Sequence, residues 1–284
     1  MSSVLFDAPG PKARARYRLF TVVAGIAVLA VVLASLWKLY DADQFTQERW
    51  EPFVTPRIVN LLLEGIVSTL AAAAVAIALS IIFGLVFGPA KLSEHWWIRW
   101  PAWAVVEFFR AVPLLMLIIV MFYALGAQLD NAFLALVVGL VLYNGSVLAE
   151  IFRAGINAVP QGQSEAAYAI GMRKSAVMRI ILIPQAIKIM LPSIIGQSVV
   201  ALKDTSLGYV ITAPGLTYAG KQIYREFQNV FATGLVLAVL YIALNLVLSY
   251  FANLAQRRLA QGKKLDVPMG GEAGSGAPPT GTGA

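Results

Sequence analysis

Six long apolar stretches constrain this chain more than any other feature of its sequence. A helix needs about 20 mainly apolar residues to cross a bilayer, and such stretches lie near residues 19–37, 62–88, 101–127, 131–152, 189–212 and 230–252. Of the 284 residues, 59% are hydrophobic and only 13% are charged, which is about half the charged share of an average soluble domain. The sequence therefore predicts an all-α, polytopic membrane bundle of six transmembrane helices.

The basic residues predict the orientation of these helices. Lysine and arginine collect in the cytoplasmic loops of membrane proteins, and an even number of spans places both termini on one side. Of the 22 basic residues, 16 fall on one side of the predicted bundle. They are Lys12, Arg14, Arg16, Arg18, Lys91, Arg99, Arg110, Arg153, Arg173, Lys174, Arg179, Lys188, Arg257, Arg258, Lys263 and Lys264. We therefore expect both termini to be cytoplasmic.

The composition argues against several classes of site. The chain has no cysteine and a single histidine, His95, so it offers neither a thiolate or polyhistidine metal site nor a cysteine nucleophile. The formal charge of +7 is distributed between apolar segments, which favours membrane orientation over nucleic acid binding. No metal or cofactor is expected. The glycine-rich loop of ATP-hydrolysing chains, ending in Gly-Lys-Ser or Gly-Lys-Thr, does not occur in this sequence.

The ends of the chain differ in composition from its middle. Residues 1–18 form a basic arm, which we expect to be cytoplasmic, and residues 19–57 hold the first span and an external loop. Residues 256–284 end in a stretch rich in glycine, proline, alanine and threonine, which cannot bury enough apolar surface to order itself. We expect this last segment to be a disordered cytoplasmic tail.

The longest predicted cytoplasmic connection, residues 153–188, separates the fourth and fifth spans. Ser164 is placed to cap a short helix over residues 165–170, with Glu165 in its first turn and Gly171 positioned to end it in a left-handed conformation. Residues 172–183 are amphipathic, which predicts a segment along the membrane surface. Residues 184–192, with a proline at each end, would then lead into the fifth span.

This connection resembles the EAA signature of ABC importer permeases. The residues that match the spacing of that signature are Glu165, Ala166, Ala167, Gly171, Ile181, Ile183 and Pro184, where only Ile183 replaces the usual leucine. The resemblance implies that Glu165 to Gly171, preceded by Ser164, form a coupling helix. Such a helix docks on a separate ATP-binding cassette subunit, so the chain would be a transporter subunit without an ATPase site of its own.

Further segments are similar to permeases for polar amino acids such as histidine, glutamine, glutamate and arginine. They are residues 107–115, Asn144, residues 149–156 and residues 202–207. The resemblance implies a permease domain over residues 58–255, with the five-helix core of type I ABC importers and one added N-terminal helix. It also implies import of a polar amino acid, with glutamate as our preferred substrate, across a bacterial plasma membrane. The implied partners are a second permease subunit, identical or homologous, and an extracellular or periplasmic amino-acid-binding protein.

Polar side chains inside the predicted spans are candidates for the substrate pathway, because charges in the bilayer are costly and rarely face lipid. An amino acid zwitterion needs donors for its carboxylate and acceptors for its ammonium group. The candidates are Glu64, Ser68, Thr69, Arg110, Asn144, Lys203, Asp204, Thr205 and Ser206.

Some of these polar groups have an alternative, structural role. Glu107 and Arg110, and likewise Glu150 and Arg153, are three residues apart and can form ion pairs on one helix face. The small-residue steps Gly84 to Gly88 and Ala71 to Ala74 predict close helix packing.

Two other function classes stay open at this point. One is a proton-coupled secondary amino acid transporter, with Glu64, Glu107 or Asp204 as relay groups, although no inverted repeat is visible in the six spans. The other is a membrane enzyme, which the single histidine and the lack of cysteine disfavour.

Limited proteolysis of inside-out membrane vesicles tests the orientation. We expect protease to remove residues 256–284 from such vesicles, because an unfolded cytoplasmic segment is open to cleavage. Protection of this segment would contradict both its disorder and its side of the membrane.

Overall fold

The computed structural model describes residues 10–260, and these residues form helices without any β-strand. The α-helices are α1 (Pro11–Asp41), α2 (Gln47–Trp50), α3 (Pro56–Ala90), α4 (Trp96–Ala111), α5 (Leu114–Met121), α6 (Ala132–Asn157), α7 (Gln161–Ala169), α8 (Lys174–Ala176), α9 (Ile183–Asp204), α10 (Leu216–Phe227) and α11 (Val230–Ala260). Two 3₁₀ segments, Glu51–Val54 and Thr205–Ile211, and two π-helical turns, Phe122–Gly126 and Val177–Leu182, join some of them. The all-α prediction is confirmed.

Five helical segments of the described chain are long and apolar enough to cross a membrane. They are Lys12–Asp41, Pro56–Ala90, Ala132–Asn157, Lys174–Ile211 and Val230–Arg257. The pair α4 and α5 makes a sixth crossing if the two are counted as one broken span. The number of predicted spans therefore agrees with the structure.

The third predicted span, residues 101–127, is not one continuous helix. The axes of α4 and α5 differ by 101° across a short break. Val112 precedes Pro113 and has extended backbone angles, φ −79° and ψ 129°, because the proline ring disfavours a helical conformation in the residue before it. Proline also lacks the N–H that would continue the helix. The prediction of a single helix here was wrong.

Several other predicted boundaries also need correction. The connection at residues 153–188 is mostly helical, since α6 runs to Asn157 and a helical segment begins again at Lys174. Most of residues 172–183 continue directly into α9 through a π-helical turn, so this segment is not separated from the fifth span. Residues 256–260 extend α11, and the rest of the predicted tail lies outside the described residues. The basic residues from Lys12 to Arg18 belong to the first turns of α1.

The core of the bundle is the contact between α3 and α6, the most extensive between any two described helices. A Cβ atom added to Gly88 would lie 2.7 Å from Cβ of Phe152 and 2.8 Å from the carbonyl oxygen of Ala149. One added to Gly84 would lie 2.9 Å from Cβ of Leu148. The predicted Gly84–Gly88 step is thus a close-packing surface within this chain, since only glycine lets the two backbones approach this closely. The Ala71–Ala74 step is exposed, and the buried alanines lie at 72, 73 and 76 instead.

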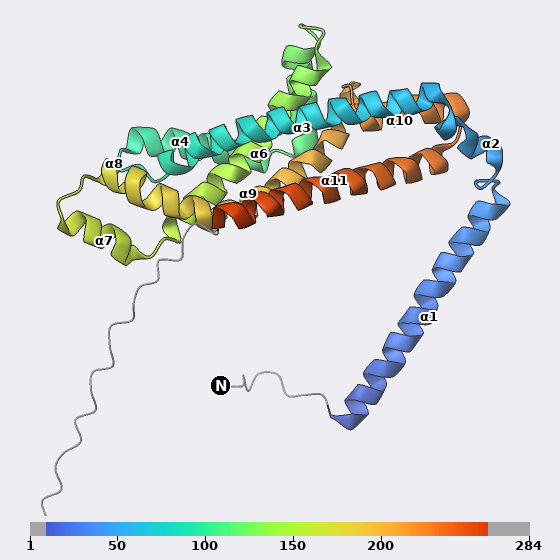
Figure 1. Ribbon diagram of the computed structural model, residues 1–284, viewed down its shortest axis with the longest axis horizontal. Coiled ribbons are helices and arrows are strands. Elements are labelled where there is room, and N and C mark those ends of the chain that lie inside the picture. The colour runs from blue at the N-terminus through green and yellow to red at the C-terminus, as the bar shows by residue number, and fades with distance from the viewer. Residues whose placement is uncertain (1–9, 261–284) are drawn as a thin grey trace, which may run out of the picture.

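The ends of the bundle carry different elements (Figure 1). The helices α4, α7 and α8 lie at one end, and α2 with the loop that leads into α3 lies at the other. Helix α1 extends away from the bundle, and its apolar window is 0% buried. Its apolar side chains therefore face lipid or another subunit in a membrane.

The α3–α6 contact generates a stability prediction. The substitution Gly88→Ala is expected to lower the free energy of unfolding by about 1–3 kcal/mol, because the added methyl group overpacks a rigid contact. Gly234→Ala on α11 is the matched control, since a Cβ at that position meets nothing within 4 Å. Unfolding of the full chain in detergent, followed by circular dichroism, measures both variants. Equal stability of the two would contradict the packing account.

Candidate functional site

Helix α7 ends in the conformation expected from the sequence. Gly171 has a φ of +80°, and its N–H donates to the carbonyl oxygen of Tyr168 at 2.9 Å. The N–H of Met172 donates to the carbonyl oxygen of Ala167 at 3.1 Å. These two bonds form a Schellman motif, in which a left-handed residue satisfies the last carbonyl groups of a helix. The predicted stop at Gly171 is confirmed.

The predicted start of this helix was wrong. Helix α7 begins at Gln161, about one turn before the expected position. Pro160, with φ −54° and ψ 130°, immediately precedes it, and its fixed φ suits the residue that leads into a helix. Ser164 therefore lies inside the helix, and its hydroxyl donates to the carbonyl oxygen of Gln161 at 2.8 Å. Glu165 is then in the second turn, not in the first.

One side of α7 packs on the bundle and the other is free. Ala167 is only 3% exposed, whereas Ile170 is 78% exposed. Glu165 and Ala166 are exposed as well. Within residues 10–260, Glu165 has no hydrogen bond or ion pair. This side of α7 therefore offers a carboxylate and an apolar side chain to another molecule.

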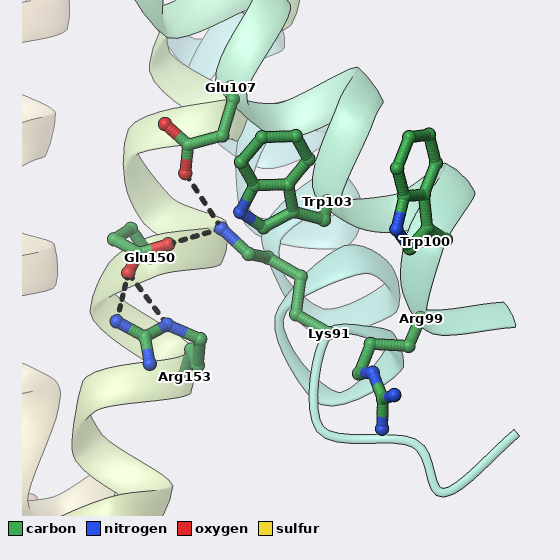
Figure 2. Close-up of a pocket in the computed structure, with 7 residues that line it drawn as sticks. All are labelled: Lys91, Arg99, Trp100, Trp103, Glu107, Glu150 and Arg153. Carbon is green, nitrogen blue, oxygen red and sulfur yellow. Dashed lines mark hydrogen bonds and ion pairs between the residues drawn. The ribbon is translucent and has the colours of Figure 1, made fainter. Parts of the chain in front are cut away.

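A cluster of five charged side chains, which we name the Lys91 cluster, joins the end of α3 to α4 and α6, and Figure 2 draws all of its members except Arg110. It consists of Lys91, Glu107, Arg110, Glu150 and Arg153. The ammonium group of Lys91 is 3.0 Å from Oε1 of Glu107 and 2.7 Å from Oε2 of Glu150, and its side chain is 4% exposed. Because Lys91 directly follows α3, these bonds join the end of α3 to α4 and α6.

Both ion pairs predicted from the sequence occur in the Lys91 cluster. Nη1 of Arg110 is 3.3 Å from Oε1 of Glu107, and Nε of Arg153 donates to Oε1 of Glu150 at 2.6 Å. Lys91 was missed as the centre of this cluster, because a lysine at the end of an apolar helix ordinarily marks only the membrane interface. The cluster also takes in Arg110, which was a candidate for the substrate pathway.

A second polar group, the Asn144 network, joins α6 to α9. Asn144 is 1% exposed, its Oδ1 accepts from Nε2 of Gln197 at 2.6 Å, and its Nδ2 lies 3.4 Å from Oδ2 of Asp204. The structure thus brings Asn144 and Asp204 together as the sequence suggested. Gln197 was missed, although it is a polar residue inside the fifth predicted span, a position where polar side chains find partners on other helices.

The other pathway candidates lie elsewhere. The hydroxyl of Thr69 accepts from the N–H of Leu216 at 2.9 Å, so it joins α3 to α10 in a buried structural contact. The hydroxyl of Thr205 donates to the carbonyl oxygen of Leu202 at 2.7 Å. Glu64 is exposed and Ser68 is half-buried, both on α3. The predicted set is therefore not one continuous surface in this chain.

Lys203 and Ser206 line a groove between α9 and α11 with a volume of about 550 Å³. The side chain of Asn245 reaches the groove from α11, where its Nδ2 donates to the carbonyl oxygen of Tyr241 at 2.6 Å. Its Oδ1 is buried without a hydrogen-bond partner among the residues that the structure describes. An exposed ammonium group and a hydroxyl group thus share one groove, whereas the amide oxygen of Asn245 is buried. The ammonium and hydroxyl groups can bind a carboxylate.

An exposed ion pair fastens the segment that follows α7. Nζ of Lys174 lies 2.6 Å from Oε1 of Glu94 in the loop between α3 and α4. The hydrogen bond from this ammonium group, together with its charge, holds the pKa of Glu94 below its ordinary value. Exposed pairs of this kind contribute little to stability.

Known proteins resemble this chain over most of its length. The profile of the family described as "Binding-protein-dependent transport system inner membrane component" matches residues 80–261. The glutamate transport system permease protein GluD of Corynebacterium glutamicum is 37% identical over 226 residues, which cover 78% of this chain and 83% of that protein. The probable glutamine ABC transporter permease protein GlnM of Bacillus subtilis is 32% identical over 203 residues, covering 70% and 94%.

A solved structure has the same fold. It is described as the crystal structure of an amino acid ABC transporter with histidines, and its chain aligns with a TM-score of 0.66 and 32% sequence identity. The alignment covers 71% of this chain and 95% of that one. The helix arrangement is therefore that of an ABC transporter permease.

The contribution of Lys91 to stability can be compared with that of Lys174, which forms an exposed ion pair. Lys91→Met is expected to lower the free energy of unfolding by about 1–3 kcal/mol, because Glu107 and Glu150 lose their shared buried cation and keep only their bonds to arginines. Lys174→Met removes a similar Lys–Glu pair whose side chains are 43% and 70% exposed, and is expected to change stability by less than about 1 kcal/mol. Chemical denaturation of the full chain measures both. A cost for Lys91→Met no greater than that of the control would contradict the role given to Lys91.

Proposed function

We propose that this chain, which belongs to the family of binding-protein-dependent transport system inner membrane components, is the permease subunit that admits glutamate in an amino acid ABC importer. Its membership of the family makes it a multi-pass transporter subunit, and ATP hydrolysis belongs to another chain. Glutamate as the substrate is our proposal. It is supported by 37% identity to a glutamate permease and by the exposed lysine in the groove between α9 and α11.

The free side of α7 is the observation that carries the ATP-driven mechanism. Its carboxylate at Glu165 and its apolar side chain at Ile170 are exposed and have no partner surface within residues 10–260. The Schellman motif at Gly171 ends the helix rigidly before the chain turns back toward the bundle. We propose that this side of α7 docks on the ATP-binding cassette subunit, with Ser164 to Ala167 in the contact region.

The position of α7 in the chain explains how docking can reach the pathway. Only residues 158–160 separate α7 from α6, and residues 170–173 separate it from the helical segment that leads into α9. The same two helices carry the Asn144 network. A displacement of α7 therefore acts on both sides of that network through short links, which transmit motion better than long flexible loops.

The substrate pathway that we propose lies along α9. Asn144, Asp204 and Gln197 offer amide and carboxylate oxygens that suit an ammonium group. Lys203, next to Asp204 in sequence but pointing in a different direction, offers a cation that suits a carboxylate, with Ser206 beside it in the groove. A glutamate ion carries two carboxylates and one ammonium group, so it can use both sets.

The remaining partners follow from the family. ABC importers of this family work with two permease subunits and a binding protein that delivers the substrate. We propose that this chain pairs with an identical or homologous permease in a bacterial plasma membrane and receives its amino acid from an extracellular or periplasmic binding protein.

Docking of α7 can be tested with two glycines of the same segment. Gly171→Val is expected to abolish co-purification with the ATP-binding subunit, because a β-branched residue at φ +80° is strained and displaces the helix end. Gly162 lies in the same helix with open space around it, so the Gly162→Ala variant should co-purify normally. Glu165→Ala is expected to weaken the association without affecting the fold of the chain. Normal co-purification of both Gly171→Val and Glu165→Ala would contradict docking through α7.

Lys203→Gln tests the substrate. Glutamate uptake by the assembled transporter, with saturating wild-type binding protein, is expected to fall about tenfold, the effect of losing one charge-assisted hydrogen bond. Uptake of glutamine, if the transporter carries it, should fall much less. Lys188 is exposed on α9 and does not line the groove, so Lys188→Gln is the control. Equal uptake by Lys203→Gln and Lys188→Gln would remove Lys203 from the pathway.

A further inference from the structure

A pocket of about 580 Å³ opens beside the Lys91 cluster and is distinct from the groove along α9. Its lining is made up of Lys91, of Glu150 and Arg153 from α6, and of Arg99, Trp100, Trp103 and Glu107 from α4. Figure 2 shows the Trp103 ring next to the Lys91 side chain, with Arg99 below Trp100 at the edge of the pocket. The pocket therefore combines cationic groups with large aromatic surfaces.

Positive charge exceeds negative charge around this pocket. Its lining holds three cations, Lys91, Arg99 and Arg153, and two carboxylates, Glu107 and Glu150. The guanidinium group of Arg99 donates only to the carbonyl oxygen of Ser93, at 3.3 Å, among the described residues. Three cations against two carboxylates leave an excess of one positive charge. A charge near a membrane is stable only when it is paired or solvated, so the pocket favours an anionic ligand.

The tryptophans place this pocket at the level of the lipid headgroups. Helix α4 exposes four indole side chains, Trp96, Trp97, Trp100 and Trp103, with exposed fractions of 70%, 59%, 65% and 51%. Tryptophan concentrates at the boundary between hydrocarbon and water, where the ring has an apolar body and a polar N–H group. An anion that enters the pocket at this level has lipid chains as its neighbours.

We propose that this pocket binds the phosphate group of an anionic phospholipid. The guanidinium group of Arg99 supplies donors for the phosphate oxygens, and so does Nη1 of Arg153, whose Nε and Nη2 contact Glu150. Guanidinium–phosphate hydrogen bonds are strong because both partners are charged. The acyl chains extend along the exposed rings of Trp100 and Trp103. Basic pockets between transmembrane helices bind anionic headgroups for the same reason. The lipid would hold α4 against the ends of α3 and α6, on the side of the bundle that carries α7.

Lipid retention by the complete transporter tests this site. The transporter is extracted from bilayers with equal amounts of phosphatidylglycerol and phosphatidylcholine, and native mass spectrometry measures the lipid that stays bound. Wild-type transporter is expected to retain several-fold more phosphatidylglycerol than phosphatidylcholine. Arg99→Gln is expected to lower phosphatidylglycerol retention by roughly fivefold, the effect of one basic residue near an anionic headgroup. Lys188→Gln, exposed and outside the pocket, should retain as much as the wild type.

Two further arms distinguish the lipid from free phosphate. Trp103→Ala should reduce phosphatidylglycerol retention, because it removes surface that the acyl chains cover. An excess of glycerol 3-phosphate should not displace the lipid, since it has the charge but no acyl chains. Displacement by glycerol 3-phosphate would overturn the proposal in favour of a site for soluble phosphate. Equal retention of the two lipids by the wild type, or unchanged retention by Arg99→Gln, would also overturn it.

Discussion

The buried ammonium group of Lys91 holds together the part of this structure on which the rest depends. It lies at the end of α3 and bonds carboxylates of α4 and α6 at 3.0 and 2.7 Å. A cation in a low-dielectric region is costly unless carboxylates neutralise it, so the three helices meet where these three charges meet. The glycines that let α3 approach α6 occupy the last turns of α3 just before this lysine. Close packing and charge neutralisation therefore act on the same end of the same helix pair.

This arrangement determines which contacts of α6 are held by buried charges and which by hydrogen bonds and apolar packing. Helix α6 is fastened to α3 and α4 on one side, while α7 follows it after three residues and leads back toward α9. The Asn144 network joins α6 to α9 by hydrogen bonds, which can be exchanged for others at small net cost, and apolar side chains such as Phe152 and Met190 pack between the same two helices. In an ABC permease, force applied to α7 would therefore act first on α6 and α9, the two helices that it joins.

The sequence predicted the features that depend on neighbouring residues and grouped Asn144 with Asp204, but it missed most of the other contacts between distant residues. The left-handed stop at Gly171 and the pairs Glu107–Arg110 and Glu150–Arg153 follow from spacing along one helix. The role of Lys91 depends on carboxylates 16 and 59 residues away, and that of Thr69 on a backbone group 147 residues away. The start of α7 was predicted wrongly because two helix-start signals lie close together. The helix begins directly after Pro160, not after Ser164.

If ATP on another subunit drives transport through α7, the energy source of uptake tests this most directly. The complete transporter in proteoliposomes, with its binding protein outside and ATP inside, should accumulate glutamate only when ATP can be hydrolysed. Collapsing the proton gradient should leave the rate unchanged. Accumulation driven by an imposed proton gradient in the absence of ATP would contradict the account.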